Sequence, residues 1–530
     1  MKIVDTPRAL RALARSGLLA PTRPDRLLRA GFALRYWGMS LAAGFAAGAA
    51  RFGDRIGIID ERGPLTYGEL DRRGNALAHG LRALGVEPGT VVGILCRNHR
   101  YFVDITGACS KVGAHALYLN TAFSVPQLRE VVAREQVGAL VVDEEFTPIV
   151  EGFDAGPIVL AWTEGSERTS TGPTIDQLVA QHDPTPPPRP TVIGRTIVLT
   201  SGTTGTPKGA SREHTAAIGP AFAMLDRIPY EAGETMLIAA PMFHSWGFGN
   251  FTIGLALGDT MVCERRFDPE ATLAAIEQHR ANVLVAVPVM LQRILELPPE
   301  VCARYDTSSL RLVPLSGSAI PGGLAPRWMK QFGPNIYNLY GSTEVGYATV
   351  ATPEDLEAAP GTAGKPPAGT TVKIFDERGN ELPTGETGRI FVHSDLLFDG
   401  YTGGGSKPML DGFMSTGDTG HFDANGRLFV EGREDEMIVS GGENVFPREV
   451  EDLLSSRDDV VEAAVVGVPD EEFGQRLKAY VVRAPGQPLD ADTVRNYVKA
   501  NLAGFKVPRD VEFVDELPRN ATGKVVKRAL

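Results

Sequence analysis

The sequence predicts a protein of mixed α/β and α+β class: a large N-terminal region of parallel α/β layers with a β-rich subdomain, then a small C-terminal α+β domain. Three observations predict this class. The 530 residues exceed the size at which one hydrophobic core stops growing. In the first part of the chain, β-branched runs alternate with helical patterns. Beyond residue 361, short strands separated by glycine-containing turns take over, and the last stretch mixes helices with strands.

These changes in composition and hydrophobic pattern along the chain also predict its division into domains. We expect a basic N-terminal extension at residues 1–51, which could form a surface helix. A large domain is expected at residues 52–434, with its β-rich subdomain starting near residue 361. The remaining residues, 435–530, are expected to form the small C-terminal domain.

Composition narrows the function classes. The net charge of −12 argues against nucleic acid as the main partner. The first 51 residues differ from the rest, because they hold nine lysines and arginines against two aspartates. The four cysteines show no C-x-x-C spacing, which favours reduced, buried thiols and a cytoplasmic protein.

Residues 25–37 combine apolar and basic side chains in the manner of an interfacial helix. The apolar members are Leu27, Leu28, Phe32, Leu34 and Trp37, and the basic members are Arg26, Arg29 and Arg35. This pattern predicts peripheral contact with the inner membrane surface. A helix packed on its own domain is the alternative. The apolar residues 39–50 are too few to span a bilayer.

The α/β rhythm starts after this extension. Thr66 and Glu69 form a capping box that begins a helix ending at Gly85. Strands are expected at residues 91–96, 116–119, 139–142 and 158–161, with a helix at residues 102–112. Residues 163–190 are polar and rich in proline, so we expect an extended surface connection there.

A phosphate-binding loop follows the predicted strand 196–199. Its glycines let backbone N–H groups approach phosphate oxygens, its hydroxyls add donors, and its lysine adds a positive charge. The loop differs from Walker A, because Pro207 and Gly209 replace residues that this motif requires. The candidate phosphate ligands are Thr200, Ser201, Gly202, Thr203, Thr204, Gly205 and Lys208.

Later strands also end in polar motifs. The strand at residues 234–240 leads to a loop with His244 and Trp246, and the strand at residues 312–315 leads to Ser316, Gly317 and Ser318. The strand at residues 336–339 ends in the run Tyr340 to Glu344. In open α/β sheets the carboxyl ends of strands are where ligands bind. We therefore expect these motifs to form one ligand site.

The C-terminal part has the predicted β-rich and α+β character. Strands are expected at residues 371–375, 388–392 and 427–431. Beyond them we expect helices at residues 447–454 and 491–501 and strands at residues 460–468 and 479–483.

Four motifs carry a family resemblance: the phosphate loop, the run Tyr340 to Glu344, Ser415-Thr416-Gly417-Asp418, and residues 518–524, which end in Lys524. By these motifs, residues 65–528 resemble the adenylate-forming superfamily and specifically its fatty-acyl-CoA synthetases. The resemblance implies that a carboxylic acid attacks the α-phosphate of ATP and releases pyrophosphate. Coenzyme A then takes the acyl group from the acyl-adenylate.

The resemblance also implies residue roles. Thr200–Lys208 would hold the β- and γ-phosphates, and Thr204 and Glu344 would bind Mg²⁺. Tyr340 would stack on adenine beside Gly341, and Asp418 and Arg433 would hold the ribose or phosphate. Ser316, Gly317 and Ser318 would line the adenine side.

The catalytic assignments are Lys524, which would bridge the acid and the α-phosphate, Thr343 at the α-phosphate, and His244. His244, Trp246 and Phe248 would form the acyl pocket.

The family's hinge position falls on Asp435, and Ser440, Gly441 and Gly442 would line the CoA tunnel. Lys524 and this glycine loop lie far apart in the small domain, so we expect that domain to rotate about Asp435 between the two half-reactions. Glu436 and Val439 depart from the family's pattern near the hinge.

We therefore predict an ATP-dependent ligase that joins a medium- or long-chain fatty acid to coenzyme A. An aryl or other acid:CoA ligase, or an enzyme that loads a carrier protein, is the close alternative. A non-catalytic nucleotide-binding or membrane-scaffold protein is the alternative from another class. A homodimer is a further candidate assembly.

Overall fold

The computed structural model describes residues 6–18, 20, 22–164, 172–199, 208–211, 218–321, 323–402, 404–440, 443–470, 473–520 and 523–530. The chain divides into two compact units. Unit 1 comprises Met1–Ala286, Leu297–Pro314 and Phe398–Ser406, and unit 2 comprises Val287–Glu296, Leu315–Leu397 and Lys407–Leu530. The predicted mixture of parallel α/β layers and a β-rich, α+β C-terminal part is confirmed. The predicted domain boundaries remain predictions.

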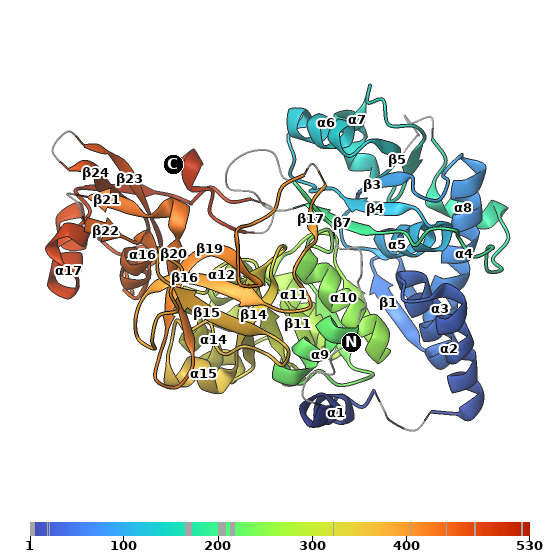
Figure 1. The fold of residues 1–530 in the computed structure, drawn as a ribbon, viewed down its shortest axis with the longest axis horizontal. Helices are drawn as coiled ribbons and strands as arrows, with labels where there is room; N and C mark the ends of the chain where they lie inside the picture. The colour runs from blue at the N-terminus through green and yellow to red at the C-terminus, as the bar shows by residue number, and fades with distance from the viewer. Residues whose placement is uncertain are drawn as a thin grey trace. The chain divides into compact units, whose positions relative to one another are not determined.

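Unit 1 contains a sheet in the order β17-β8-β7-β4-β3-β5-β6 (Figure 1). Strands β7, β4, β3, β5 and β6 are parallel, whereas β8 and β17 add on as antiparallel strands. The bounds are β3 Val91–Leu95, β4 His115–Tyr118, β5 Val137–Val142, β6 Ile158–Leu160, β7 Thr196–Leu199, β8 Gly209–Ser211 and β17 Gly400–Tyr401. Near-continuous apolar runs make these strands, as expected for parallel strands with both faces covered.

A second sheet of unit 1 has the order β11-β9-β10-β1-β2. Its bounds are β1 Ile56–Asp60, β2 Gly63–Thr66, β9 Thr235–Ile238, β10 Thr260–Cys263 and β11 Val283–Val285. The short strand β12 (Val313–Leu315) ends at the boundary with unit 2.

Unit 1 also contains the helices given below. They are α1 Thr6–Arg15, α2 Pro24–Trp37, α3 Leu41–Phe52, α4 Tyr67–Ala83, α5 Arg100–Val112, α6 Val125–Arg134, α7 Thr147–Val150, α8 Ile175–Gln181, α9 Ile218–Arg227, α10 Ser245–Leu257, α11 Pro269–His279 and α13 Pro299–Cys302. The capping box predicted at Thr66 begins α4, since Thr66 and Glu69 satisfy each other's backbone N–H groups. No helix among the described residues is long and apolar enough to cross a membrane.

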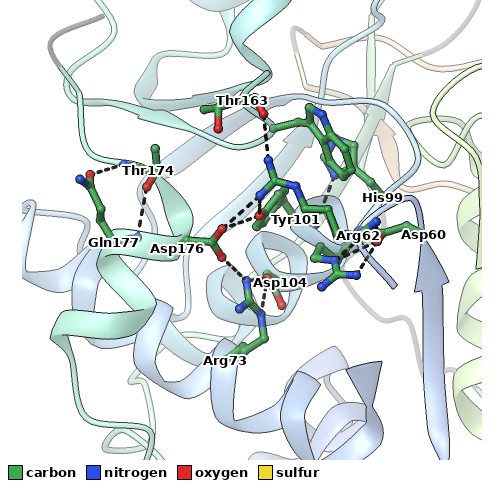
Figure 2. A network of polar contacts seen from close by, with 12 residues as sticks. Asp60, Arg62, Arg73, His99, Tyr101, Asp104, Thr163, Thr174, Asp176 and Gln177 are labelled. Atoms are coloured by element: carbon green, nitrogen blue, oxygen red, sulfur yellow. Dashed lines mark hydrogen bonds and ion pairs between the residues drawn. The ribbon is translucent and has the colours of Figure 1, made fainter. Parts of the chain in front are cut away.

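Helix α8 contradicts one prediction, because residues 163–190 were expected to be extended throughout. Thr174 accepts a hydrogen bond from the Gln177 N–H, and the Gln177 side chain caps Thr174 in return. Figure 2 shows Asp176 pointing from α8 toward Tyr101 and Arg73. The Tyr101 hydroxyl donates to Asp176 at 2.5 Å, and Arg73 donates to it at 2.9 Å. The helix thus forms because a capping box and a polar network outweigh a composition typical of loops.

Most strand pairs of unit 2 are antiparallel. Strand β13 (Ile336–Ser342) forms a hairpin with β14 (Gly346–Ala351). A second sheet has the order β15-β16-β19-β18, and β20 pairs with β19. Its bounds are β15 Thr371–Phe375, β16 Gly388–His393, β18 Met409–Leu410, β19 Phe413–Phe422 and β20 Leu428–Arg433.

The last sheet of unit 2 has the order β22-β21-β24-β23, and β25 runs parallel to β24. Its bounds are β21 Ile438–Ser440, β22 Glu443–Val445, β23 Val460–Asp470, β24 Gly474–Arg483 and β25 Asp510–Val514. It has its own core with α16 (Pro447–Ser455) and α17 (Ala491–Asn501). Unit 2 also holds α12 Pro288–Leu295, α14 Leu324–Phe332 and α15 Pro353–Ala358.

Candidate active site

The centre of the candidate site in unit 2 is the carboxylate of Asp418. The register of β19 and β20 places Asp418 directly opposite Arg433, with Nη1 of Arg433 3.8 Å from Oδ1 of Asp418. From β13, the hydroxyl of Tyr340 donates to Oδ2 of Asp418 at 2.5 Å. The pairing of β19 with β20 thus brings Asp418 to Arg433, and a side-chain hydrogen bond joins Tyr340 of a different sheet to them. All three residues were predicted for the nucleotide site.

The electrostatics tie Lys524 to the same carboxylate. Burial raises the pKa of Asp418, and the Tyr340 hydrogen bond and the charges of Arg433 and Lys524 act against that rise. Burial, followed by the nearby Asp418 charge, raises the pKa of Tyr340 well above its usual value. Tyr340 therefore remains a neutral donor, and the carboxylate lies among positive charges suited to an anionic ligand.

Two hydrogen bonds with Asn520 hold the backbone of Lys524 in place. The Lys524 N–H donates to Oδ1 of Asn520 at 3.0 Å, and the Asn520 N–H donates to the Lys524 carbonyl at 2.9 Å. Gly523 has a φ of +77°, and a Cβ there would lie 2.4 Å from Val289 Cγ1. Arg519 donates to the Gly523 carbonyl at 2.6 Å and is paired with Glu462. These contacts thus fix the backbone position from which the Lys524 side chain extends.

The hairpin turn between β13 and β14 carries Thr343 and Glu344. Glu344 is only 8% exposed, and its N–H donates to Oγ of Ser342 at 3.2 Å. Gly341 is needed at the bulge before the turn, because a Cβ there would lie 2.0 Å from the Gly346 carbonyl oxygen. The oxygens of this buried carboxylate are hard ligands of the kind that Mg²⁺ prefers.

The Ser316–Ser318 motif also lies in unit 2. Ser316 is buried, and Gly317 adopts a φ of +96°, a left-handed conformation that favours glycine.

In unit 1, His244 begins α10 as its N-cap residue. Its Nε2 atom is buried and has no hydrogen-bond partner among the residues that the structure describes. Burial lowers the pKa of His244 to about 4, so the ring is neutral near pH 7. A buried, unpartnered ring nitrogen is a group that a bound ligand can satisfy.

Aromatic rings surround the start of α10. The ring of Phe248 packs edge-on against that of Tyr118, with 5.0 Å between the ring centroids. It also stacks with the ring of Phe251, with 6.2 Å between the centroids. Tyr118 packs in turn on Phe102 at 4.8 Å. Trp246 is 7% exposed, and its ring N–H donates to the Ala286 carbonyl at 3.0 Å. Trp246 is therefore held in place by the fold, whereas Phe248 remains partly exposed.

Several predicted residues lie outside the described part of the chain. These are Thr200, Ser201, Gly202, Thr203, Thr204 and Gly205 of the phosphate loop and Gly441 and Gly442 of the CoA loop. Lys208 is described: it is exposed at the start of β8, with its ammonium 5.1 Å from the centre of the Tyr401 ring.

The predicted hinge region is short. Asp435 lies in a single 3₁₀ turn, Glu434–Glu436, and is exposed. Its carboxylate pairs with Nε of Arg433 at 2.9 Å. Ser440 is buried at the end of β21.

Sequence reasoning missed Lys407. Its ammonium lies 3.5 Å from the Thr416 carbonyl oxygen, and its charge also lowers the pKa of Asp418 against the larger effect of burial. No motif marks Lys407, because its position depends on how the preceding loop meets β19.

One other cluster resembles a metal site but is better explained as structure. Cys96, His99 and Asp143 are buried close together in unit 1. Asp143 accepts hydrogen bonds from His99 and from the Arg97 N–H, each at 2.9 Å, and the other ring nitrogen of His99 accepts from the Tyr101 N–H at 3.2 Å. Because both ring nitrogens are occupied, this cluster caps α5 rather than offering metal ligands.

Comparison with known proteins identifies the family of this chain. A family model described as AMP-binding enzyme matches residues 45–402, and one described as AMP-binding enzyme C-terminal domain matches residues 449–524. The chain is 35% identical to a feruloyl-CoA synthase from an Amycolatopsis species, over 87% of this chain and 92% of the relative. It is 33% identical to the indoleacetate–CoA ligase of Aromatoleum aromaticum, over the same shares of the two chains.

Two further similarities bear on function and fold. The fatty acid–[acyl-carrier-protein] ligase ScoC of Streptomyces coeruleorubidus is 33% identical over 89% of this chain and 92% of the relative. The crystal structure of ATP-bound MatB from Rhodopseudomonas palustris matches with a TM-score of 0.82 at 28% identity, covering 92% of this chain and 98% of MatB.

Proposed function

This chain belongs to the AMP-binding enzyme family, and from that premise we propose that it joins a compact aromatic or aryl-alkyl carboxylic acid to coenzyme A. The protein is an AMP-forming acid:CoA ligase that uses ATP and coenzyme A. The choice of an aromatic acid is the proposed part. The fatty-acid preference predicted from the sequence remains a prediction.

The observation that carries the aromatic proposal is the ring cluster at the start of α10. Phe248 is the partly exposed member of a chain of contacts with Tyr118, Phe102 and Phe251. Ring edges and faces favour another ring as a partner over a flexible alkyl chain of equal area. The feruloyl and indoleacetate ligases among the relatives support the same substrate class.

In the proposed reaction, the residues of unit 2 hold the nucleotide. Asp418 would accept hydrogen bonds from the ribose hydroxyls, and Arg433 would lie beside the ribose or phosphate. Lys524 would neutralise the like charges of the acid and the α-phosphate as they approach each other. Position and countercharge supply most of the catalysis in such a transfer.

Mg²⁺ fits the buried carboxylate of Glu344, with Thr204 as the second proposed ligand. When bound, the ion supplies countercharge to the triphosphate. His244, neutral at physiological pH, would close the wall of the acid pocket as an uncharged donor or acceptor. Roles for Thr343 and for Ser316–Ser318 at the nucleotide remain part of this proposal.

A panel of acids in the ATP–pyrophosphate exchange assay tests the substrate class. We expect cinnamic-type and indole-type acids to give a higher kcat/KM than octanoate or palmitate. Phe248→Ala should reduce kcat/KM for the aryl acids and leave the short alkyl acids less affected. Higher kcat/KM for palmitate than for every aryl acid would overturn the aromatic proposal and favour the fatty-acid ligase.

A carrier-loading enzyme is the second candidate, supported by the similarity to ScoC. The two candidates differ in the second half-reaction. If coenzyme A drives net release of AMP from the acyl-adenylate, the chain is a CoA ligase. Release of AMP only when a carrier protein is added would support the second candidate.

The proposal also includes a cellular location and an oligomeric state. The four cysteines are buried and form no disulfide, which supports a reducing, cytoplasmic location. The homodimer stays a prediction.

A further inference from the structure

Helix α2 presents an apolar face that no described part of the chain covers. Leu28 and Phe32 lie one turn apart and are 66% and 69% exposed. Leu27 and Leu34 lie two turns apart and are 50% and 48% exposed. Together with Tyr36 and Met39, they supply six of the twelve exposed large hydrophobic side chains found among the described residues. Such clustering on one helix marks an interaction surface rather than scattered exposure.

The opposite side of α2 fixes the helix on unit 1. Ala30 and Trp37 are buried there, and Trp37 packs with Ala42 and Ala43 of α3. Helix α3 is anchored in turn, because the Ala42 N–H donates to Oγ of Ser110 on α5 at 2.9 Å. The apolar face is therefore a rigid part of the unit.

Basic side chains accompany this face. Arg35 lies one turn beyond Phe32 and two turns beyond Leu28 on the exposed side, and Arg29 is also exposed. Arg26 instead turns inward and donates to the Arg51 carbonyl at 3.0 Å. Residues 1–51, which include α2, hold nine lysines and arginines against two aspartates in a chain of net charge −12, and one of these aspartates, Asp25, pairs with Arg29 at 3.4 Å.

This combination selects one kind of partner. A second copy of the chain docking by the same face would bring its own arginines against Arg29 and Arg35, which like-charge repulsion disfavours. An anionic lipid surface complements both features, because leucine and phenylalanine enter the acyl boundary while arginines contact the headgroups. The AMP-binding family model begins at residue 45, so this face lies outside the region that the model matches.

We propose that the face of α2 formed by Leu27, Leu28, Phe32 and Leu34 docks unit 1 onto an anionic phospholipid surface, with Arg29 and Arg35 contacting the headgroups. Binding at this face is independent of the ligase reaction. An acid that partitions into membranes would then reach the enzyme from a surface rather than from dilute solution.

Sedimentation of the full-length protein with unilamellar vesicles tests the proposal. Vesicles of phosphatidylcholine with phosphatidylglycerol are compared with vesicles of phosphatidylcholine alone, at low and high salt. We expect binding to the mixed vesicles that weakens with salt. Leu28→Glu with Phe32→Glu should reduce the partition coefficient at least tenfold, and Arg29→Gln with Arg35→Gln should reduce it roughly twentyfold at low salt.

Phe505→Glu is the matched control, because Phe505 is an exposed aromatic residue in unit 2, 40% exposed. It should bind vesicles like the natural sequence, and thermal unfolding checks that each variant is folded. Equal binding to both kinds of vesicle, or no loss in the Leu28 and Phe32 variant, would overturn the proposal. So would a dimer in solution that this variant converts to a monomer while vesicle binding is absent.

Discussion

At the scale of single residues, Lys524 is the side chain whose proposed role is most specific. A hydrogen bond to Asn520 holds the backbone of Lys524. Its positive charge lowers the pKa of the buried Asp418, against the larger effect of burial. We expect Lys524→Ala to slow adenylation by about 10² to 10³-fold, because one positioned charge is lost at the transition state. Thiolation of supplied acyl-adenylate should persist, as single-turnover kinetics of each half-reaction would measure. Equal loss in both half-reactions would contradict the assignment.

Lys407 offers a second residue-scale prediction. Because its ammonium helps to hold Asp418 ionised, Lys407→Gln should raise the KM for ATP about fivefold, equivalent to about 1 kcal/mol. Lys330→Gln on α14 is the control, since Lys330 is an exposed lysine of the same unit. Unchanged KM values in both variants would remove Lys407 from the site.

Glu264 gives stability a pH dependence. Burial, with Glu61 and Asp268 nearby, raises the pKa of Glu264 to about 7 from its ordinary value of 4.5. The folded state therefore binds this proton more tightly than the unfolded state does. The protonated Glu264 side chain thus contributes fully to the free energy of unfolding below pH 4.5, and this contribution is lost as pH rises through about 7.

Glu264→Gln removes this titration. The melting temperature of the variant relative to the natural sequence should therefore rise between pH 5 and pH 8. Differential scanning fluorimetry measures this, with the exposed Glu357→Gln as control. A difference that stays constant with pH would show that Glu264 does not titrate in this range.

At the scale of elements, α8 shows what holds a connection in place. Asp176 receives hydrogen bonds from Tyr101 and Arg73, so Asp176→Ala should free the helix from α4 and α5 at a cost of about 1 kcal/mol (Figure 2). Amide hydrogen exchange in residues 175–181 should become faster. Gln181→Ala, at the exposed end of α8, should leave the exchange rates unchanged.

Most elements that carry motifs could be predicted, because local pattern specifies them. The Thr66 capping box and the apolar run of β7 are local features. Helix α8 was missed because prolines and polar residues around it favour a loop, although Thr174 and Gln177 carried a helix-start signal.

Sequence motifs marked candidate site residues but could not give their geometry. Tyr340 and Asp418 are marked by motifs, yet the hydrogen bond between them joins two separate sheets, which no local pattern specifies. The unpartnered nitrogen of His244 depends on burial by other elements, which a sequence pattern does not contain.

At the scale of the whole molecule, the proposed reaction needs two arrangements of the C-terminal part. The 3₁₀ turn at Asp435 is the proposed pivot. Asp435→Pro would restrict φ there and should slow thiolation about tenfold or more while adenylation is affected less. Rapid-quench measurements of the two steps check this, and equal rates in variant and natural protein would place the pivot elsewhere.

The pairing of β8 with β17 also has a consequence for synthesis on the ribosome. Residues 209–211 become available long before residues 400–401, which must add alongside them. At usual elongation rates, the nascent chain carries an uncovered sheet margin for about 10 to 40 s. With only three residues, that margin offers little template for mispairing with neighbouring nascent chains.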